Sequence, residues 1–141
     1  MPICLDESIC TADDARKALE LGSCRIATIK LARVGGLTEA SAIHDVCMEH
    51  GVGVCCGSML DAGVAKAHNI TAATLPNFIY PNDIPPTCKN FLEDYTKPEV
   101  VLKPGSVVDV PMGPGIGFDI KTETLDAWTS EKLVFDRVDL K

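Results

Sequence analysis

The sequence predicts an α/β fold built on a parallel sheet, which is either half of a (β/α)8 barrel or a small doubly wound sheet. Three observations support this prediction. Short apolar runs alternate with stretches of helical length in units of roughly 22 to 27 residues, as strands joined by helical crossovers do. Two of the apolar runs end in a charged residue. Prolines are frequent after Tyr80 and sparse before it.

Each element follows from the local residue pattern. Thr11, with Asp14 three residues later, predicts a capping box for the first helix, and Gly22 is suited to end that helix. Gly51 ends the second helix, and Pro76 closes a third helix that is rich in small residues. The expected strands are the apolar runs 3–5, 24–31, 52–56 and 78–80, and the expected helices cover 12–21, 38–50 and 62–74.

The character of the chain changes behind Tyr80. Prolines recur throughout the segment after Tyr80, so we expect loops and short extended pieces there rather than regular helices. We therefore divide the chain into a partial barrel over 1–86 and a carboxyl-terminal extension over 87–141, which packs on the barrel or on a capping region. The glycine-rich stretch 112–117 lacks the flanking strand and βαβ unit of a dinucleotide site, so we interpret it as part of a covering tail.

Length and charge exclude several classes of protein. At 141 residues the chain has the size of one domain but is too short for a whole (β/α)8 barrel, which takes roughly 250 residues. The net charge of −7 and the lack of Lys/Arg clusters argue against binding to nucleic acid or to an anionic membrane. Because there is also no apolar run of spanning length and no targeting pattern, we expect a soluble cytoplasmic protein.

The seven cysteines do not form a recognisable disulfide or metal pattern. Their number is odd and no C-x-x-C pair occurs. Most have apolar neighbours, which favours buried free thiols in a reducing compartment. The three histidines, His44, His50 and His68, are not spaced for a zinc site.

Asp6 and Lys30 close two of the apolar runs and are the first candidates for chemistry. One strand, one helix and their loops separate them, which places them on neighbouring parallel strands. The carboxyl ends of such strands meet at one rim, where α/β barrels carry their active sites, so both residues should face one pocket. From the pattern alone, Asp6 could instead cap a turn, and Lys30 could be a strand-end lysine whose amine reaches solvent.

Several motifs carry a resemblance that covers nearly the whole chain. They are LDES at 5–8, IKLARVGGL at 29–37, CGSML at 56–60, AHN at 67–69 and PMGPGIG at 111–117. In this order and spacing they resemble the carboxyl-terminal half of an enolase-superfamily barrel, and the nearest match is the N-acylamino acid racemase and o-succinylbenzoate synthase branch. The resemblance implies a half barrel made of strands 5 to 8.

The resemblance also implies specific roles. In this superfamily, acidic residues at the ends of strands 3 to 5 hold a divalent metal, usually Mg2+ (or Mn2+), and lysines on strands 2 and 6 face the substrate. The fifth-strand metal ligand falls on Asp6 and the sixth-strand catalytic lysine on Lys30. The other lysine and acids would precede Met1, so we expect a fragment, or one piece of a split enzyme whose partner is the missing amino-terminal half.

Three further residues match positions that line the substrate pocket. Ser58, Met59 and Asp83 are expected to contact a small carboxylate, either an N-acylamino acid or a succinylbenzoate precursor. Alternatively, Ser58 and Met59 could pack at the rim of the barrel, and Asp83 could stabilise a turn. His68 falls within the predicted helix 62–74 and not at the end of a strand, which argues against a catalytic histidine base. The sequence does not separate racemase from synthase. A different class of hypothesis is a catalytically inactive half barrel that associates with another copy of itself.

Overall fold

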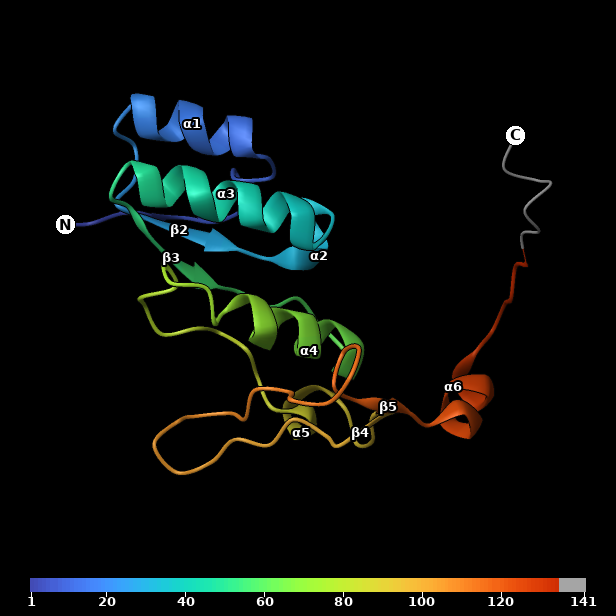
Figure 1. Cartoon of the computed structure of the whole chain (residues 1–141). Coiled ribbons are helices and arrows are strands. Elements are labelled where there is room, and N and C mark those ends of the chain that lie inside the picture. The colour runs from blue at the N-terminus through green and yellow to red at the C-terminus, as the bar shows by residue number, and fades with distance from the viewer. Residues whose placement is uncertain (135–141) are drawn as a thin grey trace.

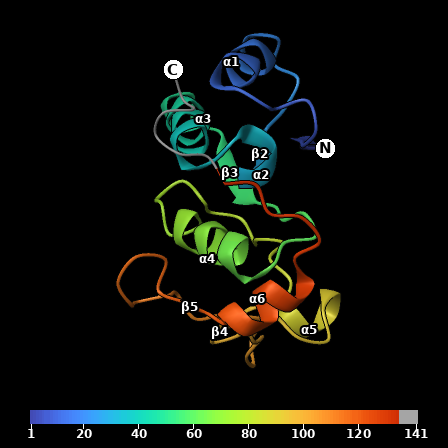
Figure 2. The same cartoon turned by 90° about the vertical axis from the view of Figure 1, so that its right-hand side faces the viewer.

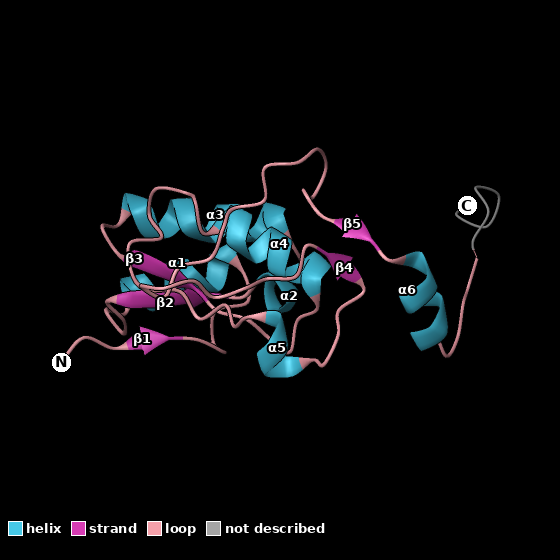
Figure 3. Cartoon of the chain, turned by 90° about the horizontal axis from the view of Figure 1, so that it is seen from below, coloured by secondary structure: helices cyan, strands magenta, loops and turns pink. Residues whose placement is uncertain are grey.

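A three-stranded parallel sheet lies at the centre of the computed structural model, which describes residues 1–134 (Figure 1). The strands are β1 (Cys4–Leu5), β2 (Ile26–Ile29) and β3 (Gly53–Cys56), and they lie in the order β1-β2-β3. Figure 3 shows them side by side, with a second, two-stranded sheet apart from them. Because all three strands run parallel, their carboxyl ends open at the same edge.

Helices cover one face of this sheet. α3 (Leu37–Glu49) packs on β2 and β3, and α1 (Ala12–Glu20) packs against α3 (Figures 1 and 2). The buried core between them is apolar and includes Ile9, Ala15, Ala27, Ile29, Ile43, Val46, Val54 and Cys56. The opposite face of β2 and β3 carries Thr28 and Cys55, which are only half-buried.

The predicted helices and strands of the partial barrel are present, with end shifts of at most two residues, except for the strand at 78–80. The third helix is α4 (Gly63–Ala72). The sequence did not predict α2 (Leu31–Val34), a single turn that follows Lys30 directly. It ends at Gly35, whose φ of 85° lies in the left-handed region that glycine adopts without strain.

The predicted capping box at the start of α1 is confirmed. The Thr11 hydroxyl accepts a hydrogen bond from the Asp14 N–H at 3.1 Å, and the Asp14 carboxylate accepts one from the Thr11 N–H at 3.0 Å. The hydrogen bond from the Thr11 side chain holds the pKa of Asp14 below its usual value. Two of the amide groups at the helix start are therefore satisfied locally.

Thr11→Ala is expected to lower the free energy of unfolding by about 1 kcal/mol, because it removes the acceptor of the Asp14 amide. Urea denaturation followed by circular dichroism measures this. Thr11→Ser keeps the hydroxyl and is the matched control, which should retain most of the parent stability. Equal losses in the two variants would contradict the capping role.

The predicted strand at 78–80 is wrong as a regular strand. This segment runs parallel to β3, but a single bridge joins the two within the described residues. Pro81 has no N–H to donate, so the ladder cannot continue past it. The Asn82 side chain accepts from the Cys56 N–H at 2.7 Å instead, and the Asp83 N–H donates to the Cys56 carbonyl at 2.8 Å. Residues 1–86 therefore contain three parallel strands and one irregular segment beside β3.

The extension has more regular structure than the sequence predicted. It contains α5 (Thr87–Asn90), the antiparallel pair β4 (Thr96–Lys97) and β5 (Asp119–Ile120), and α6 (Thr122–Trp128). The expectation that helices are absent behind Tyr80 is therefore wrong. α5 begins directly after Pro86, which tolerates a helix start, and α6 lies beyond the last proline of the chain, Pro114.

The extension docks on α4. The Asp94 carboxylate accepts a hydrogen bond from the Gly63 N–H at 3.1 Å, and the buried Thr96 lies against the same glycine. Lys66 is fully buried, with its ammonium nitrogen 5.4 Å from the centre of the Phe91 ring. Burial lowers the pKa of Lys66, and the nearby Asp94 carboxylate opposes this shift.

The cysteines differ in how far they are buried. All seven are free thiols; Cys24, Cys47 and Cys56 are buried, Cys55 is half-buried, and Cys4, Cys10 and Cys88 are exposed. Burial raises the pKa of Cys47 to about 11 and of Cys56 to about 12, so these thiols stay protonated at neutral pH. The prediction of buried thiols is thus confirmed for three of them and wrong for the three exposed ones.

Across residues 1–134, no helix combines the length and the apolar character that crossing a membrane would require.

Candidate active site

Asp6 and Lys30 meet at the carboxyl edge of the sheet, as the sequence predicts. Asp6 directly follows β1 and Lys30 directly follows β2. The Lys30 amine lies 2.7 Å from one Asp6 carboxylate oxygen, and the Glu7 carboxylate lies 3.8 Å from the same amine. The Lys30 side chain is 17% exposed and that of Asp6 is 32% exposed, so the pair is partly shielded but open to a ligand.

Arg33 is a third member of this cluster. It lies on α2, one turn after Lys30, and its guanidinium contacts the other carboxylate oxygen of Asp6. The same guanidinium donates to the Ile9 carbonyl at 3.1 Å and to the Thr28 carbonyl at 2.7 Å. Both Asp6 oxygens are therefore held by cations, and the planar guanidinium ties the loop after β1 to β2.

The two cations keep Asp6 ionised. Burial alone would raise the pKa of Asp6, but the hydrogen bonds from Lys30 and Arg33, together with their charges, outweigh burial and lower it. A carboxyl whose pKa is lowered in the folded state contributes stability above its unfolded pKa. That contribution is lost as the pH falls through the folded-state pKa.

Asp6→Asn is therefore expected to be less stable than the parent at neutral pH, with a difference that shrinks as the pH falls from about 5 towards about 2. Urea denaturation of both chains in EDTA across this range measures the difference. Asp13→Asn is the control, because Asp13 pairs with Arg16 on the surface and should contribute little at any pH. A deficit of Asp6→Asn that stays constant with pH would contradict the pairing.

Gly57, the first residue after β3, lies directly beside the Lys30 side chain. A Cβ atom at this position would be 2.7 Å from the Thr28 methyl and 2.8 Å from Lys30 Cε. The Gly57 N–H donates to the Ile29 carbonyl at 2.9 Å, so the sheet fixes its position. Glycine at this position leaves the space through which Lys30 extends towards Asp6.

Gly57→Ala is expected to push Lys30 away from Asp6 and so to raise the pKa of Asp6 towards its ordinary value. It should also lower the free energy of unfolding by about 1 to 3 kcal/mol, as overpacking does. NMR titration of the Asp6 carboxyl carbon measures the first effect. Adding Thr28→Ser removes the other close contact, so recovery of the parent pKa in the double variant would show that Lys30 is not the group displaced.

The three predicted substrate-binding residues lie together. A surface hollow of about 360 Å³ is lined by Ser58, Met59, Leu60, Asp83, Pro85, Lys89 and Asn90. One face of the hollow comes from the segment after β3, and the other comes from the segment before α5 and from α5 itself. It therefore contains hydroxyl, carboxylate, amine and amide groups beside apolar ones.

Asp61 fixes the segment that carries Ser58 and Met59. Its buried carboxylate accepts hydrogen bonds from the Ser58 hydroxyl at 2.7 Å and from the Met59 N–H at 2.9 Å. The Asn69 side chain of α4 donates to the same oxygen at 2.9 Å. The wall of the hollow is thus tied to a helix.

The structure places the predicted residues in two groups. Asp6 and Lys30 form one, and Ser58, Met59 and Asp83 form the other. Gly57 connects them, because it contacts Lys30 and precedes Ser58 in the chain. The lining of the hollow itself includes neither Asp6 nor Lys30.

The described residues supply only part of a site for a divalent metal. Asp6 offers the oxygen donors that a hard cation prefers, at a strand end that is partly exposed. However, residues 1–134 contain no group of three or more His, Cys, Asp and Glu side chains that could hold a metal ion. Asp6 therefore fits as one ligand, and the remaining ligands would have to come from outside this set.

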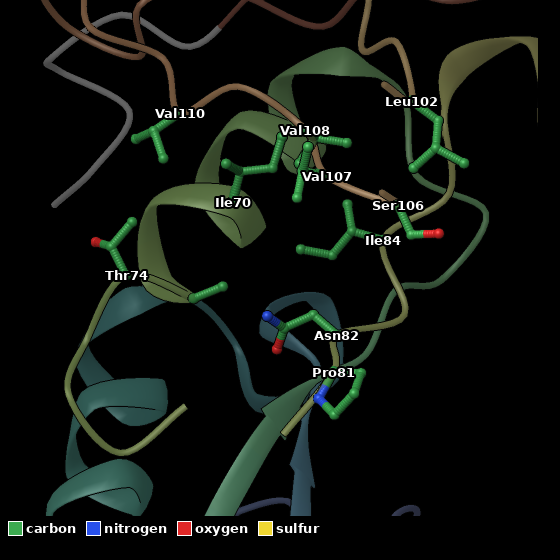
Figure 4. Close-up of a pocket in the computed structure, with 11 residues that line it drawn as sticks. Ile70, Thr74, Pro81, Asn82, Ile84, Leu102, Ser106, Val107, Val108 and Val110 are labelled. Atoms are coloured by element: carbon green, nitrogen blue, oxygen red, sulfur yellow. The ribbon is translucent and has the colours of Figure 1, made fainter. Parts of the chain in front are cut away.

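A separate cavity lies between α4 and the extension (Figure 4). It measures about 430 Å³, and its lining is largely apolar, with Ile70 on α4, Ile84 before α5, and Val107 and Val110 in the extension. Its lining includes none of the five predicted site residues. We therefore assign it to the packing of the extension and not to the candidate site.

Arg33, Asp61 and Gly57 are the members that the sequence analysis did not assign. Arg33 could have been recognised from the sequence as a second cation one turn after Lys30. Asp61 could have been recognised as an acidic residue three positions after Ser58. No local pattern indicated Gly57, because its importance comes from a side chain on another strand.

Comparison with known proteins identifies the family of the chain. A family profile described as enolase C-terminal domain-like matches residues 1–124. The o-succinylbenzoate synthase of Geobacillus stearothermophilus is 52% identical over 136 residues, which are 96% of this chain and 36% of that protein. An N-succinylamino acid racemase of Amycolatopsis is 44% identical over 132 residues, which are 94% of this chain and 35% of that protein.

A solved structure gives the same result. The crystal structure of an enolase-superfamily member from Listeria innocua superposes with a TM-score of 0.87 at 39% identity, and covers 93% of this chain and 35% of that protein. The chain thus spans about a third of the length of the curated relatives it matches.

Proposed function

Because the chain belongs to the enolase C-terminal domain-like family, we propose that it is the carboxyl-terminal part of a metal-dependent enzyme that removes the proton next to a substrate carboxylate. Relatives named o-succinylbenzoate synthase and N-succinylamino acid racemase support this reaction class. The observation that carries the proposal is the Asp6–Lys30 pair, 2.7 Å apart at the carboxyl ends of adjacent parallel strands.

Lys30 is the proposed catalytic residue. Its amine emerges from the rim beside the hollow, where it can take a proton from, or return one to, the carbon next to the carboxylate. A racemase needs this exchange from Lys30 on one face and from a second base on the other. A synthase that eliminates water can use Lys30 mainly as a positive charge that stabilises the enolate.

Asp6 is the proposed metal ligand. A bound Mg2+ or Mn2+ would supply positive charge beside the substrate carboxylate and so make the adjacent proton easier to remove. Asp6 would contribute one oxygen ligand, and Arg33 would keep its carboxylate ionised and correctly oriented. The other ligands, and the second base, would come from polypeptide equivalent to the remaining two-thirds of the relatives.

Ser58, Met59 and Asp83 are the proposed substrate contacts. Together they line one hollow that Gly57 connects to Lys30. The names of the relatives support a small carboxylate as substrate, either an N-acylamino acid or the precursor of o-succinylbenzoate. Asp61 would hold Ser58 and Met59 in place for this contact.

A hybrid enzyme tests the proposal. The matching segment of the Geobacillus stearothermophilus synthase is replaced by this chain, and the product is called the Geobacillus hybrid below. The 52% identity over 136 residues makes the exchange practicable. With Mg2+, the hybrid is expected to convert a synthase substrate or to exchange the α-proton of an N-succinylamino acid. This chain alone is expected to do neither.

A hybrid that folds and binds metal but performs neither reaction would overturn the proposal. Turnover by the isolated chain would overturn the assignment of the missing groups to other polypeptide. Neither the described residues nor the relatives favour the alternative of an inactive half barrel that associates with itself.

A further inference from the structure

One face of α4 contacts both segments that form the surface hollow. α4 lies between the three-stranded sheet and the extension (Figure 1). Gly63, Lys66 and Asn69 are spaced three residues apart, so they lie along one face of this helix. The extension covers the first two, because Thr96 lies against Gly63 and the Phe91 ring lies against Lys66. The Asn69 side chain donates instead to the segment that follows β3.

The hollow has two walls, and each is tied to a buried carboxylate. The first wall, residues 58–60, is held by the hydrogen bonds that Asp61 accepts from it. The second wall, α5, begins at Thr87, whose hydroxyl donates to the Asp94 carboxylate at 3.4 Å. Asp94 also accepts from the first N–H of α4. Asp61 and Asp94 are 8% and 1% exposed, so both carboxylates lie within the protein beside α4.

Lys66 lies on α4 between the attachment points of the two walls. Its side chain is fully buried, and its amine has no hydrogen-bond partner among residues 1–134. The amine lies 5.4 Å from the centre of the ring of Phe91, the residue that directly follows α5. Burial lowers the pKa of Lys66. Four acidic groups oppose this shift, in order of decreasing effect Asp94, Asp61, Cys88 and Glu99. The amine is therefore held by charge and by an aromatic face, not by one directed hydrogen bond.

We propose that Lys66 is a positioning residue, whose buried ammonium group attracts Asp61 and Asp94 to one face of α4 and so fixes the separation of the two walls. This role rests on the proposed function, which assigns the hollow to the substrate. A charge attraction has no fixed direction, so one ammonium group can hold two carboxylates at once. Because Lys66 does not line the hollow, its loss should weaken substrate binding without removing a group that reacts.

Amide hydrogen exchange of the whole 141-residue chain tests the link between the walls without any catalysis. In Lys66→Met, two amides should exchange about tenfold faster: the Met59 N–H of the first wall, and the Phe91 N–H, which donates to the Thr87 carbonyl across the second wall. Ile43→Val, a core substitution in α3, is the control and should leave both rates unchanged. An unchanged Met59 rate in Lys66→Met, or equal acceleration in Ile43→Val, would overturn the proposal.

NMR titration of 13C-labelled lysine tests whether one amine faces both carboxylates. Asp61→Asn and Asp94→Asn should each lower the pKa of Lys66 further, because each removes a negative charge that favours the ammonium form. Asp13→Asn, on the surface of α1, is the matched control and should leave this pKa unchanged. A pKa of Lys66 that responds to only one of the two buried carboxylates would contradict the shared attraction.

Kinetics of the Geobacillus hybrid test the consequence for substrate. Lys66→Met should raise KM for an N-succinylamino acid about tenfold and leave kcat nearly unchanged. Lys66→Arg, which keeps a cation beside the Phe91 ring, should recover most of the parent KM. A loss confined to kcat would overturn the positioning role. An inactive parent hybrid would overturn the proposed function instead, and the exchange and pKa measurements would then decide whether Lys66 links the two walls.

Discussion

Lys30→Met in the Geobacillus hybrid is expected to lower both synthase and racemase activity by about 1,000-fold, within the range for loss of a general acid–base group. Methionine has nearly the length of lysine but no amine, so the Asp6 pair and the proton acceptor are lost together. Steady-state kinetics at saturating Mg2+ measure the loss, and circular dichroism shows whether the fold is kept.

Lys30→Arg is the matched variant that separates the two reactions. A guanidinium keeps the positive charge but does not give up its proton near neutral pH. Racemase activity should therefore fall as far as in Lys30→Met, while a synthase that needs only the charge should keep a measurable part of its rate. Isotope exchange of the α-proton that is unchanged in both variants would contradict the catalytic role of Lys30.

Gly63→Ala is expected to destabilise the chain by about 3 kcal/mol, although alanine normally favours a helix over glycine by roughly 0.5 to 1 kcal/mol. The added Cβ would lie 1.6 Å from the Thr96 hydroxyl oxygen, and Thr96 is fully buried. The clash would force residues 94–96 away from α4 and break the hydrogen bond from the Gly63 N–H to Asp94. Urea denaturation measures the change.

A double-mutant cycle isolates the clash. Thr96→Gly removes all the side-chain atoms that the new Cβ would meet, so Gly63→Ala should be much less harmful in that background. Additive losses would show that the two residues do not interact. Gly22→Ala is a useful comparison, because Gly22 has a positive φ but open space around it and should show backbone strain alone.

The sequence was sufficient for the elements that have strong local signals. The capping box at Thr11 and the glycine after the first helix set that helix, and the apolar runs that end at Asp6 and Lys30 set two strands. Because parallel strands share an edge, placing these two residues on adjacent strands also placed them together. This much of the candidate site follows from strand periodicity and chain spacing.

The sequence was not sufficient where one residue depends on distant backbone. Arg33 is held by the carbonyl of Ile9 and by that of Thr28, whose positions exist only once the sheet has formed. The prediction of a strand at 78–80 is wrong because Pro81 ends the ladder of backbone hydrogen bonds. The Asn82 side chain accepts the hydrogen bond from the Cys56 N–H in place of a backbone carbonyl. The prolines of the extension do not indicate α6, because that helix lies in a segment after Pro114 that contains none.

The contact between Asp94 and the first N–H of α4 has a consequence for the order in which the chain is made. The two residues are 31 positions apart, so α4 leaves the ribosome well before the carboxylate that completes its start. Until that carboxylate arrives, the Gly63 amide depends on water, and the Lys66 amine likewise lacks its Phe91 neighbour until the extension has emerged. The nascent chain therefore completes its fold only after the extension has emerged, and an interruption before Asp94 leaves an unfinished helix for chaperones or proteases to find.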